Sequence, residues 1–576
     1  MMTIQQMEKE LRVLICAQCR SQFGGDPDSV VFGMPPETID ADYAVECFSM
    51  SKLFRKSPAD IARTIANMDR PEWVDSIIPA GPYINIKLTP AFLERTVFDQ
   101  IDAEQTRFGW QKQDTPARVI VEYSSPNTNK PLHLGHIRNN VLGVAVVNLL
   151  RAMGNDVIPA SILNDRGIHI CKAMVAYRKF FEGQTPETAG MKGDHFVGMT
   201  YVRFDQESRG DESLMEEARA MLRAWEAGDP ATRDLWKRMN RWVTEGFEQT
   251  YARLGSTFEL VQFESDMYQE GKSLALDGVQ KGIFYRREDG SIWFDLRDIG
   301  LDEKAIVRGD GTSLYLTQDL GVAVDRARRY HPDRVIYVVG SEQIYHFKAL
   351  FAALGRLGFE WAAQCVHLSY GMVYLPEGKM KSREGKVIDA DNLMDDMTRM
   401  ALDVMEESHL QIDDADRRSI AEAIGIGAIK YFILKVGALK DIHFDPRGSL
   451  SFDGSTGAYL QYTHARIRSI LNRAGEVPDT DCITGWLTQK EETTLLRKLL
   501  RFPRCLSDAA ADLNPSRLAL YLWELAKLYN GFYTNHRVLD APGPEIRAAR
   551  LRLCRSVAMT LRCGLELLGI RAVERM

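Results

Sequence analysis

The chain has 576 residues, of which 45% are hydrophobic and 26% charged, so it is long enough for several domains that each bury a core. No apolar run approaches the ~18 residues of a membrane-spanning helix, and the N-terminus lacks the basic and apolar regions of a secretory signal. We therefore predict a cytoplasmic protein without a membrane segment. The formal net charge of −7 does not favour a polyanion such as a nucleic acid as a partner. Arginines do cluster in the C-terminal part, so such a partner is not excluded.

Nine cysteines are scattered along the chain. An odd number in a large protein favours reduced thiols over a disulfide framework. Only Cys16 and Cys19 form a C-x-x-C pair, and the surrounding stretch KELRVLICAQC has helical apolar spacing. We interpret the pair as part of a helix face and predict no protein-bound structural metal.

The first region, residues 1–112, is expected to mix helices and strands. The stretch AGPYINIKLTPAFLERTVFDQI, residues 80–101, is typical of a strand followed by a helix. The polar, proline-containing residues 111–117 predict a linker to the next domain.

An α/β domain is expected over residues 113–390. The β-branched run 118–123 predicts a buried strand, residues 136–154 have helical spacing, and DVIPASIL predicts a second strand, which together form the βαβ unit of a parallel sheet. An apolar strand at 333–340 runs into another helix. We therefore interpret the charged, helix-rich residues at about 185–285 as an insertion between two halves of one nucleotide-binding fold.

Residues 391–576 carry few strand signals. Stretches such as AIGIGAIKYFILKVG and EIRAARLRLCRSVAMTLRCGLELLG have helical spacing. They predict an all-α domain, most simply a bundle.

The segment SSPNTNKPLHLGHIRNN, residues 124–140, separates the first predicted strand from its helix. A zinc site fits it poorly, because His133 and His136 are three residues apart and no third ligand is evident. A turn with incidental histidines is the plain alternative. The position between strand and helix favours a phosphate site, since a helix N-terminus presents unpaired N–H groups. Gly135 permits close approach of a nucleotide to the backbone. Both imidazoles can donate hydrogen bonds to phosphate oxygens.

The tetrapeptide H-L-G-H resembles the HIGH motif of class I aminoacyl-tRNA synthetases, and the longer string is similar to the S-P-N-x-x-K-P-L-H-x-G-H-x-R pattern of the arginyl-tRNA synthetases. The resemblance covers nearly the whole chain. GTSLYLTQDLG is similar to the family's arginine-pocket helix, and FDGSTGAYLQYTHARIRSIL and YLWELAKLYNGFYTNHRVL are similar to its DALR-type anticodon-binding domain, although PSRLALYLW replaces the D-A-L-R tetrapeptide. It implies a Rossmann-type α/β catalytic domain between a mixed α/β N-terminal domain and an all-α anticodon-binding domain.

The same resemblance implies a two-step reaction, in which arginine is activated with ATP and then transferred to tRNA(Arg). His133, Gly135 and His136 would hold the ATP phosphates, with both histidines catalytic. Asp319, four residues after Tyr315 on one helix face, would hold the guanidinium of the substrate, a planar cation that needs acceptors. The full set of implied arginine-binding residues is Glu122, Ser124, Asn127, Tyr315, Asp319 and Gln343. Without the resemblance, a helix cap for Asp319 and a surface contact for Gln343 are the plainer interpretations.

The second class I motif, K-M-S-K-S, is altered in this sequence. Alignment by Lys379 and Met380 places Ser382 at the position of a lysine, while Lys381 stands one place early. These four residues are still the expected ATP contacts, and a solvated basic loop is the alternative. In arginyl enzymes a lysine before the first motif is thought to compensate, so we predict that Lys130 and Lys381 together supply the missing positive charge.

For tRNA the resemblance implies aromatic, amide and arginine side chains of the helical domain, because such groups bind unstacked loop bases. The candidates are Tyr459, Gln461, Tyr462, Arg466, Trp523 and Tyr529. For each of them a place in the helical core is an equally good interpretation. The family pattern also implies a monomer, ATP with Mg²⁺ as substrate, an N-terminal domain at the outer corner of the tRNA, and arginine activation that requires bound tRNA.

Three other functions fit parts of the sequence. A class I synthetase of the cysteinyl type would carry zinc-binding cysteines, and a small nucleotidyltransferase with H-x-G-H would be far shorter. A synthetase-like RNA-binding protein without catalysis is disfavoured, because both histidines, Asp319 and Gln343 are present.

Overall fold

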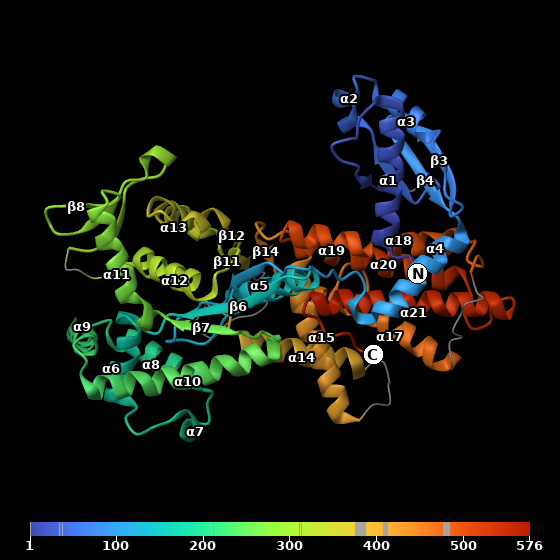
Figure 1. Ribbon diagram of the computed structural model, residues 1–576. Helices are drawn as coiled ribbons and strands as arrows, with labels where there is room; N and C mark the ends of the chain where they lie inside the picture. Colours follow the sequence, from blue (N-terminus) through green and yellow to red (C-terminus); the bar gives the residue numbers. More distant parts are fainter. Residues whose placement is uncertain are drawn as a thin grey trace.

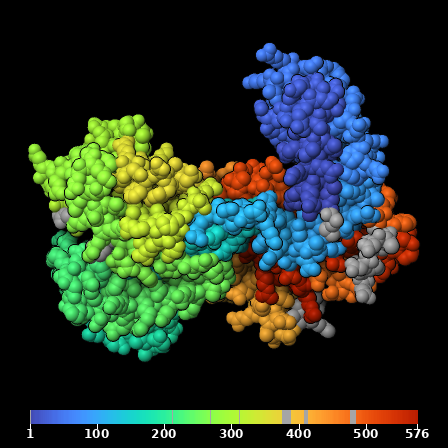
Figure 2. All heavy atoms as spheres, viewed as in Figure 1, coloured from blue at the N-terminus to red at the C-terminus, as the bar shows by residue number. Residues whose placement is uncertain are grey.

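The computed structural model (Figure 1) describes residues 2–576 except 34, 37, 211, 310, 311, 313, 375–387, 407–412 and 476–483. These residues form an N-terminal α/β region, a central α/β region and a helical C-terminal region. Figure 2 shows the N-terminal region, in blue, standing on the helical part of the molecule, away from the green and yellow end of the central region. Among the described residues, no helix combines the length and the apolar character needed to cross a bilayer.

The N-terminal region is a four-stranded antiparallel sheet with helices packed against it. In spatial order the strands are β1 (Phe32–Gly33), β2 (Tyr43–Glu46), β4 (Tyr83–Leu88) and β3 (Val74–Ala80). The helices are α1 (Ile4–Phe23), α2 (Phe48–Phe54), α3 (Pro58–Ala66), α4 (Pro90–Glu104) and the 3₁₀ helix η1 (Gln105–Arg107). The strand and helix predicted within residues 80–101 are confirmed by β4 and α4.

The C-x-x-C pair lies on α1, as predicted for a helix face. Thr3 and Gln6 form a capping box at the start of this helix. Cys19 is fully buried, Cys16 is partly exposed, and both are free thiols. Burial raises the pKa of Cys19 to about 12, so its thiol stays protonated and acts as a small apolar side chain in the core.

A five-stranded parallel sheet forms the centre of the second region. In spatial order its strands are β12 (Cys365–Tyr370), β11 (Arg334–Gly340), β5 (Arg118–Glu122), β6 (Asp156–Leu163) and β7 (Leu260–Phe263). From β5 the chain crosses through α5 (Leu134–Ala152) to β6, and from β11 through α13 (Ile344–Arg356) to β12. The order therefore reverses between β5 and β11, and the carboxyl ends of these strands flank the crevice where such folds bind ligands. The predicted α/β fold class and its βαβ unit are confirmed.

The interpretation of residues 185–285 as one insertion is wrong in one respect. The helices α7 (Pro186–Ala189), α8 (Gly193–Glu207), α9 (Glu212–Glu226) and α10 (Pro230–Leu254) do interrupt the fold, and α6 (Ile168–Phe180) packs against α8 and α9. Strand β7, however, pairs in parallel with β6 as the edge of the central sheet. Its run LVQF is too short for periodicity to distinguish it from its charged surroundings.

The sheet is followed by α11 (Glu264–Gln280), which packs against α12 (Tyr315–Tyr330). Along the chain, these two helices are separated by a small antiparallel sheet of β8 (Tyr285–Arg286), β9 (Ile292–Phe294) and β10 (Lys304–Val307). The 3₁₀ helices η2 (Arg297–Ile299), η3 (Ser341–Gln343) and η4 (Glu360–Gln364) complete the region.

The C-terminal region is helical, as predicted. Its helices are α14 (Ala390–Glu406), α15 (Asp414–Leu434), α16 (Pro446–Ser449), α17 (Gly457–Ala474), α18 (Lys490–Leu500), α19 (Phe502–Ala511), α20 (Pro515–Asn535) and α21 (Pro544–Leu567). Helix α5 packs against α15, α19 and α20. A parallel ribbon of β13 (Val373–Tyr374) and β14 (Ile442–His443) also joins the two regions. The helix that begins beside the H-L-G-H motif therefore packs in one continuous hydrophobic cluster with the C-terminal helices.

Candidate active site

The H-L-G-H motif lies at the carboxyl end of β5, where the strand order reverses. Ser124 takes a left-handed backbone conformation, with φ of 56°, two residues after the strand ends. Asn127 and Thr128 then run beside Asn164, which follows β6, and the N–H of Thr128 donates to the carbonyl of Asn164 at 3.0 Å. This turn delivers His133 to the N-cap of α5, which begins two residues before the helix start predicted at His136.

The two histidines cap α5 together. Nδ1 of His133 accepts the N–H of Gly135 at 3.1 Å, and Nδ1 of His136 accepts the N–H of His133 at 3.1 Å. A neutral imidazole has one donor and one acceptor nitrogen, so each ring carries its proton on Nε2. Within the described residues, neither Nε2 has a protein partner. The cap therefore leaves two N–H donors side by side, with ring centroids 3.8 Å apart.

The expectation that α5 presents unpaired N–H groups is wrong for its first turn. The N–H of Leu134 donates to the carbonyl of Ile388 at 3.0 Å, that of Gly135 to the His133 ring, and that of His136 to the His133 carbonyl at 2.8 Å. Capping residues satisfy these groups in most helices. A phosphate would therefore meet the two imidazoles and the positive end of the helix dipole rather than bare backbone donors.

Both imidazoles are neutral at physiological pH. Burial, together with the charge of Lys130, lowers the pKa of His133 to about 4. Burial also holds the pKa of His136 well below its usual value, with contributions from His133 and Lys130. Lys130 itself is exposed near the cap, and its positive charge acts on both histidines. The site thus combines neutral donors with a nearby cation.

Glycine is required at position 135 for a steric reason as well. A Cβ there would lie 3.0 Å from Cε1 of His133, because the ring folds back over the first turn. Gly135 thereby permits the cap itself, in addition to any close approach of a nucleotide.

A short antiparallel contact ties the histidine cap to the start of α14. The N–H of Leu134 reaches the carbonyl of Ile388, and the N–H of Ala390 donates to the carbonyl of Leu132 at 2.9 Å. Asp389 thereby lies opposite His133. The residues just before the helical region are part of the wall of the site.

His195, in the first turn of α8, contacts two carboxylates at the start of α14. Its Nε2 lies 3.2 Å from Asp389 and 3.4 Å from Asp391. The hydrogen bonds to Asp389 and Asp391 raise the pKa of His195 to about 10 against the effect of burial. His195 is therefore an imidazolium that links the four-helix interruption of the fold to the beginning of α14.

The ion pairs continue beyond His195. Nζ of Lys192 lies 2.5 Å from Asp391 and 3.2 Å from Asp194, and Arg253 pairs with Glu422 of α15 at 2.9 Å. Asp194, His195 and Asp391 lie close enough together to hold a metal ion. Because Lys192 and the imidazolium already neutralise these carboxylates, we assign the group to an ion-pair network.

Lys379, Met380, Lys381 and Ser382 lie within 375–387, outside the described residues. Their predicted contacts with ATP stay predictions.

The predicted guanidinium ligand Asp319 lies on α12, one turn after Tyr315, and both side chains are accessible. The Tyr315 side chain is 65% exposed at the start of the helix, and that of Asp319 is about one-third exposed. Oδ2 of Asp319 lies 2.5 Å from Nε2 of His346 on α13, and Nδ1 of His346 lies 3.4 Å from Nζ of Lys304. The sequence analysis missed His346 and Lys304. His346 follows Gln343 by three residues, and this helical spacing is the signal that points to it.

The structure places Glu122 and Ser124 inside the protein rather than in the pocket. Glu122 is buried and forms an ion pair with Arg326 of α12, whose side chain is fully buried. The Ser124 hydroxyl lies 2.8 Å from the Tyr251 hydroxyl and accepts from Asn140 at 2.9 Å. A protein guanidinium thus pairs with the Glu122 carboxylate in this structure. Binding of arginine by Glu122 and Ser124 stays a prediction.

Asn127 and Gln343 remain open to a ligand. Asn127 is half-buried beside the cap, and Gln343 is exposed at the end of η3, directly after β11. Asn127 and Gln343 flank the crevice from β5 and β11. Within the described residues, neither side chain makes a hydrogen bond.

A second buried carboxylate at this edge was not predicted. Burial, together with the charges of Asp319 and Asp165, raises the pKa of Glu264, the first residue of α11, to about 8. The pKa of Asp165 is itself raised to about 6, mainly by burial. Burial and the Asp319 charge also raise the pKa of Glu122. Several carboxyl groups therefore lie close together at this edge, and a cationic ligand among them would favour their ionised forms.

Comparison with known proteins follows the same division of the chain. The family model described as tRNA synthetases class I (R), catalytic domain, matches residues 99–446. The Arginyl tRNA synthetase N terminal domain matches residues 5–88, and the DALR anticodon binding domain matches residues 460–576. The arginine–tRNA ligases of Bacteroides fragilis and Treponema denticola are 44% and 43% identical to this chain, and the matches cover 92% and 96% of it and 92% and 95% of theirs.

The chain belongs to the arginyl-tRNA synthetases. The solved arginyl-tRNA synthetase of Thermus thermophilus has the same architecture, with a TM-score of 0.83 and 28% identity over 99% of this chain and 100% of that chain. The predicted family and fold class are confirmed, and the DALR model matches although the tetrapeptide of that name is absent from this sequence.

In this synthetase the anticodon-binding helices carry an exposed group of aromatic and arginine side chains. Arg466 of α17 donates to the Tyr462 hydroxyl at 2.7 Å and lies over the Tyr462 ring, 4.6 Å from its centroid. Tyr533 of α20 is 40% exposed and lies 5.7 Å from the same guanidinium. Tyr459 is half-buried, and its hydroxyl accepts from Asn530 at 2.8 Å. Bases can stack on such rings.

Two of the predicted tRNA contacts belong to the core instead. Gln461 is fully buried, and its amide donates to the carbonyls of Ala423 and Arg571 at 3.0 and 2.8 Å. Tyr529 is fully buried against Cys554. Trp523 is half-buried. Helical spacing alone does not distinguish the inner from the outer face of a bundle whose helices pack on several sides.

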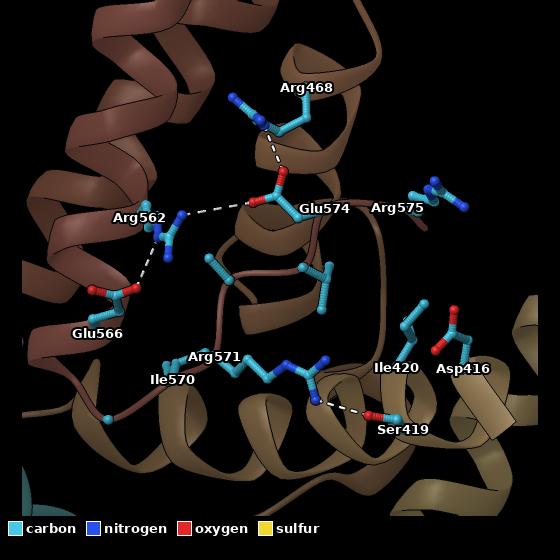
Figure 3. A pocket seen from close by; sticks show the side chains of 13 residues that line it. Asp416, Ser419, Ile420, Arg468, Arg562, Glu566, Ile570, Arg571, Glu574 and Arg575 are labelled. Atoms are coloured by element: carbon cyan, nitrogen blue, oxygen red, sulfur yellow. Dashed lines mark hydrogen bonds and ion pairs between the residues drawn. The ribbon is translucent and has the colours of Figure 1, made fainter. Parts of the chain in front are cut away.

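A cavity of about 880 Å³ lies beside these helices, between α15, α17, α21 and the C-terminal tail (Figure 3). Arg468 and Arg562 both approach Glu574, at 2.6 and 3.9 Å, and Arg571 donates to Ser419 at 2.9 Å. Arg575 also lines the cavity. Four arginines and three carboxylates line the cavity, so its wall is nearly balanced in charge, with one arginine in excess.

Proposed function

We infer that this synthetase activates L-arginine with ATP and transfers it to tRNA(Arg). One observation carries the inference. A group of carboxyl side chains around Asp319 and a pair of neutral imidazole donors lie at the same edge of one parallel sheet. Arginine is a planar cation with a carboxylate at its other end, and ATP is a polyanion, so the two halves of the site match the two ends of the reaction.

In the first step a carboxylate oxygen of arginine attacks the α-phosphorus of ATP, and the bond to pyrophosphate breaks. The Nε2–H groups of His133 and His136 donate to the phosphate oxygens, and Lys130 adds positive charge, as does Lys381 by the sequence-based prediction. Transfer of this kind depends on positioning and charge stabilisation. In the second step a hydroxyl of the terminal ribose of the tRNA attacks the arginyl carbonyl, and AMP leaves.

For the arginine substrate we propose that Asp319 and Glu264 face the guanidinium and that Tyr315 packs beside it. Asn127 and Gln343, at the ends of β5 and β11, would bind the α-amino and carboxylate groups. This assignment is supported by the raised pKa of Glu264, since a cation between the two carboxylates would relieve the repulsion that Asp319 contributes.

For tRNA(Arg) we propose that Tyr462, Arg466 and Tyr533 stack with unpaired anticodon-loop bases, with Tyr459 behind them. Arg571 and Arg575, which line the cavity at the C-terminal tail, would contact backbone phosphates nearby. We further propose that ATP enters with Mg²⁺ as the substrate complex, and that the enzyme acts as a cytoplasmic monomer without a structural metal of its own.

Pyrophosphate exchange that depends on arginine, measured with and without tRNA, tests the function. We expect exchange with arginine alone among the amino acids, and charging of total tRNA with arginine. Charging with another amino acid, or none by a folded protein, would refute the proposal.

A further inference from the structure

The short ribbon of β13 and β14 exposes a pair of stacked rings. Val373 lies opposite Ile442 and Tyr374 opposite His443. Side chains alternate between the two faces of a strand, so Ile442 is buried while Tyr374 and His443 share the outer face. The Tyr374 side chain is 44% exposed, and the two rings stack with centroids 5.3 Å apart and 26° between their planes.

This ribbon is fixed to the helix that carries the histidine cap. Arg138, two residues after His136, is almost fully buried. Its guanidinium donates to the carbonyls of Met372, Ala438 and Lys440 at 2.8, 2.7 and 2.6 Å. The last polar residue of the H-x-G-H-x-R pattern therefore does not face the phosphates. It holds the ribbon at a set distance from the first turn of α5.

The surface around the rings has the composition of a nucleic-acid contact. Met372 is 48% exposed and Leu439 is 68% exposed, a cluster of apolar side chains that has no packing role. Lys440 and Arg447 are exposed beside them, and their side chains make no hydrogen bond or ion pair within the described residues. Surfaces that bind single strands combine stacking rings with such cations.

We propose that the Tyr374–His443 ribbon stacks against the unpaired 3′-terminal nucleotides of the tRNA as they enter the active site. This proposal rests on the function proposed above. The proposed anticodon contacts Tyr462 and Arg466 lie on α17 and Tyr533 on α20; we call these three residues the anticodon platform. The ribbon, by contrast, is anchored to the first turns of α5, where the ribose of the last nucleotide must arrive. The adjacent cations match the backbone phosphates of a single strand, and the rings match its bases.

The test is a comparison of two tRNA ligands with several variants. Affinity is measured for intact tRNA(Arg) and for the same tRNA without its unpaired 3′ nucleotides. We expect Tyr374→Leu to weaken binding of the intact tRNA by about fivefold to tenfold, the lower end of the range for loss of a stacked base, and to leave the truncated tRNA unaffected. Tyr374→Phe, which keeps the ring, should restore the intact affinity. His443→Asn should reproduce the pattern of Tyr374→Leu and tests the surface independently.

Tyr533→Leu is the matched control, because it removes an exposed ring from the anticodon platform and should weaken both tRNAs equally. Equal effects of Tyr374→Leu on the two tRNAs, or none on either, would overturn the proposal. A raised KM for ATP with unchanged tRNA affinity would also overturn it and would place the rings against the adenine. Arginine charging by the wild-type enzyme is read separately, so failure of the ribbon proposal is distinct from failure of the proposed function.

Discussion

The histidine cap on α5 and the acidic pocket beside α12 occupy the same sheet edge, and burial acts on them in opposite senses. In the cap, burial removes charge from His133 and His136, which become neutral donors of fixed tautomer. In the pocket, burial raises the pKa of Glu264 to about 8, with contributions from the charges of Asp319 and Asp165. Burial therefore shifts the pKa values of the two sites in opposite directions but favours the neutral form in both, because desolvation penalises whichever form is ionised. A polyanion meets uncharged donors at the cap, whereas a cation in the pocket would draw the proton from Glu264.

The largest expected effect comes from removing the charge of the pocket. Asp319→Asn should lower kcat/KM for arginine by about 100- to 1,000-fold, because a substrate guanidinium would lose its partner in a partly buried site. Pyrophosphate exchange at varied arginine concentration measures it. Asp298→Asn is the control, since Asp298 forms an exposed ion pair with Arg356 and should leave the kinetics unchanged. A wild-type KM for arginine in Asp319→Asn would contradict the pocket assignment.

The cap can be divided into its two functions by two substitutions at His136. Asn keeps an acceptor near the Nδ1 position and loses the outer donor, so His136→Asn should fold normally and lower kcat by about 100-fold, the usual loss for one transition-state donor. Gln keeps a donor near Nε2 and loses the cap, so His136→Gln should retain more activity and melt at a lower temperature. Exchange rates and thermal unfolding separate the two. Equal kcat values in both variants would argue against a chemical role for Nε2.

The ion pairs of His195 test the difference between the cap and the pocket, because they hold Asp389 opposite His133 without contacting either histidine of the cap. His195→Gln should lower kcat by about tenfold, since a hydrogen bond to a charged group contributes ~1.5–3 kcal/mol and Lys192 still pairs with Asp391. The KM for arginine should change little, because the pocket lies on other helices. His536→Gln removes a similar His–carboxylate contact, 3.1 Å from Glu491 in the helical region, and should leave kcat unaltered. A change confined to the KM for arginine would refute the positioning role.

The smallest expected effect is a pH dependence of arginine binding. With a pKa of about 8, Glu264 is mostly protonated at pH 7 and must lose its proton to face a cation. Arginine affinity should therefore rise by about fivefold between pH 7 and pH 8.5, with proton release on binding at the lower pH. Calorimetry in buffers of different ionisation enthalpy measures the release. In Glu264→Gln both effects should vanish, and their persistence would move the titration to another group.

The local sequence pattern predicted much of the fold and part of the site. The strands β5, β6 and β11 and the helix α5 lie where β-branched runs and helical spacing predicted them, because each signal is complete within about 20 residues. Strand β7 escaped prediction, since a four-residue strand has too little period to show. His346, Lys304 and Glu264 escaped because their elements converge on Asp319 only in the folded chain.

The sequence by itself determined the family, the order of its regions and the position of the histidine cap, since these depend on motifs contiguous in the chain. Tertiary structure alone decided which polar side chains remain available to a substrate. Glu122 pairs with Arg326 at a separation of 204 positions, and Gln461 with the carbonyl of Arg571 at 110. A buried polar group must find a partner wherever the fold provides one, and that partner's distance along the chain leaves no local pattern to detect.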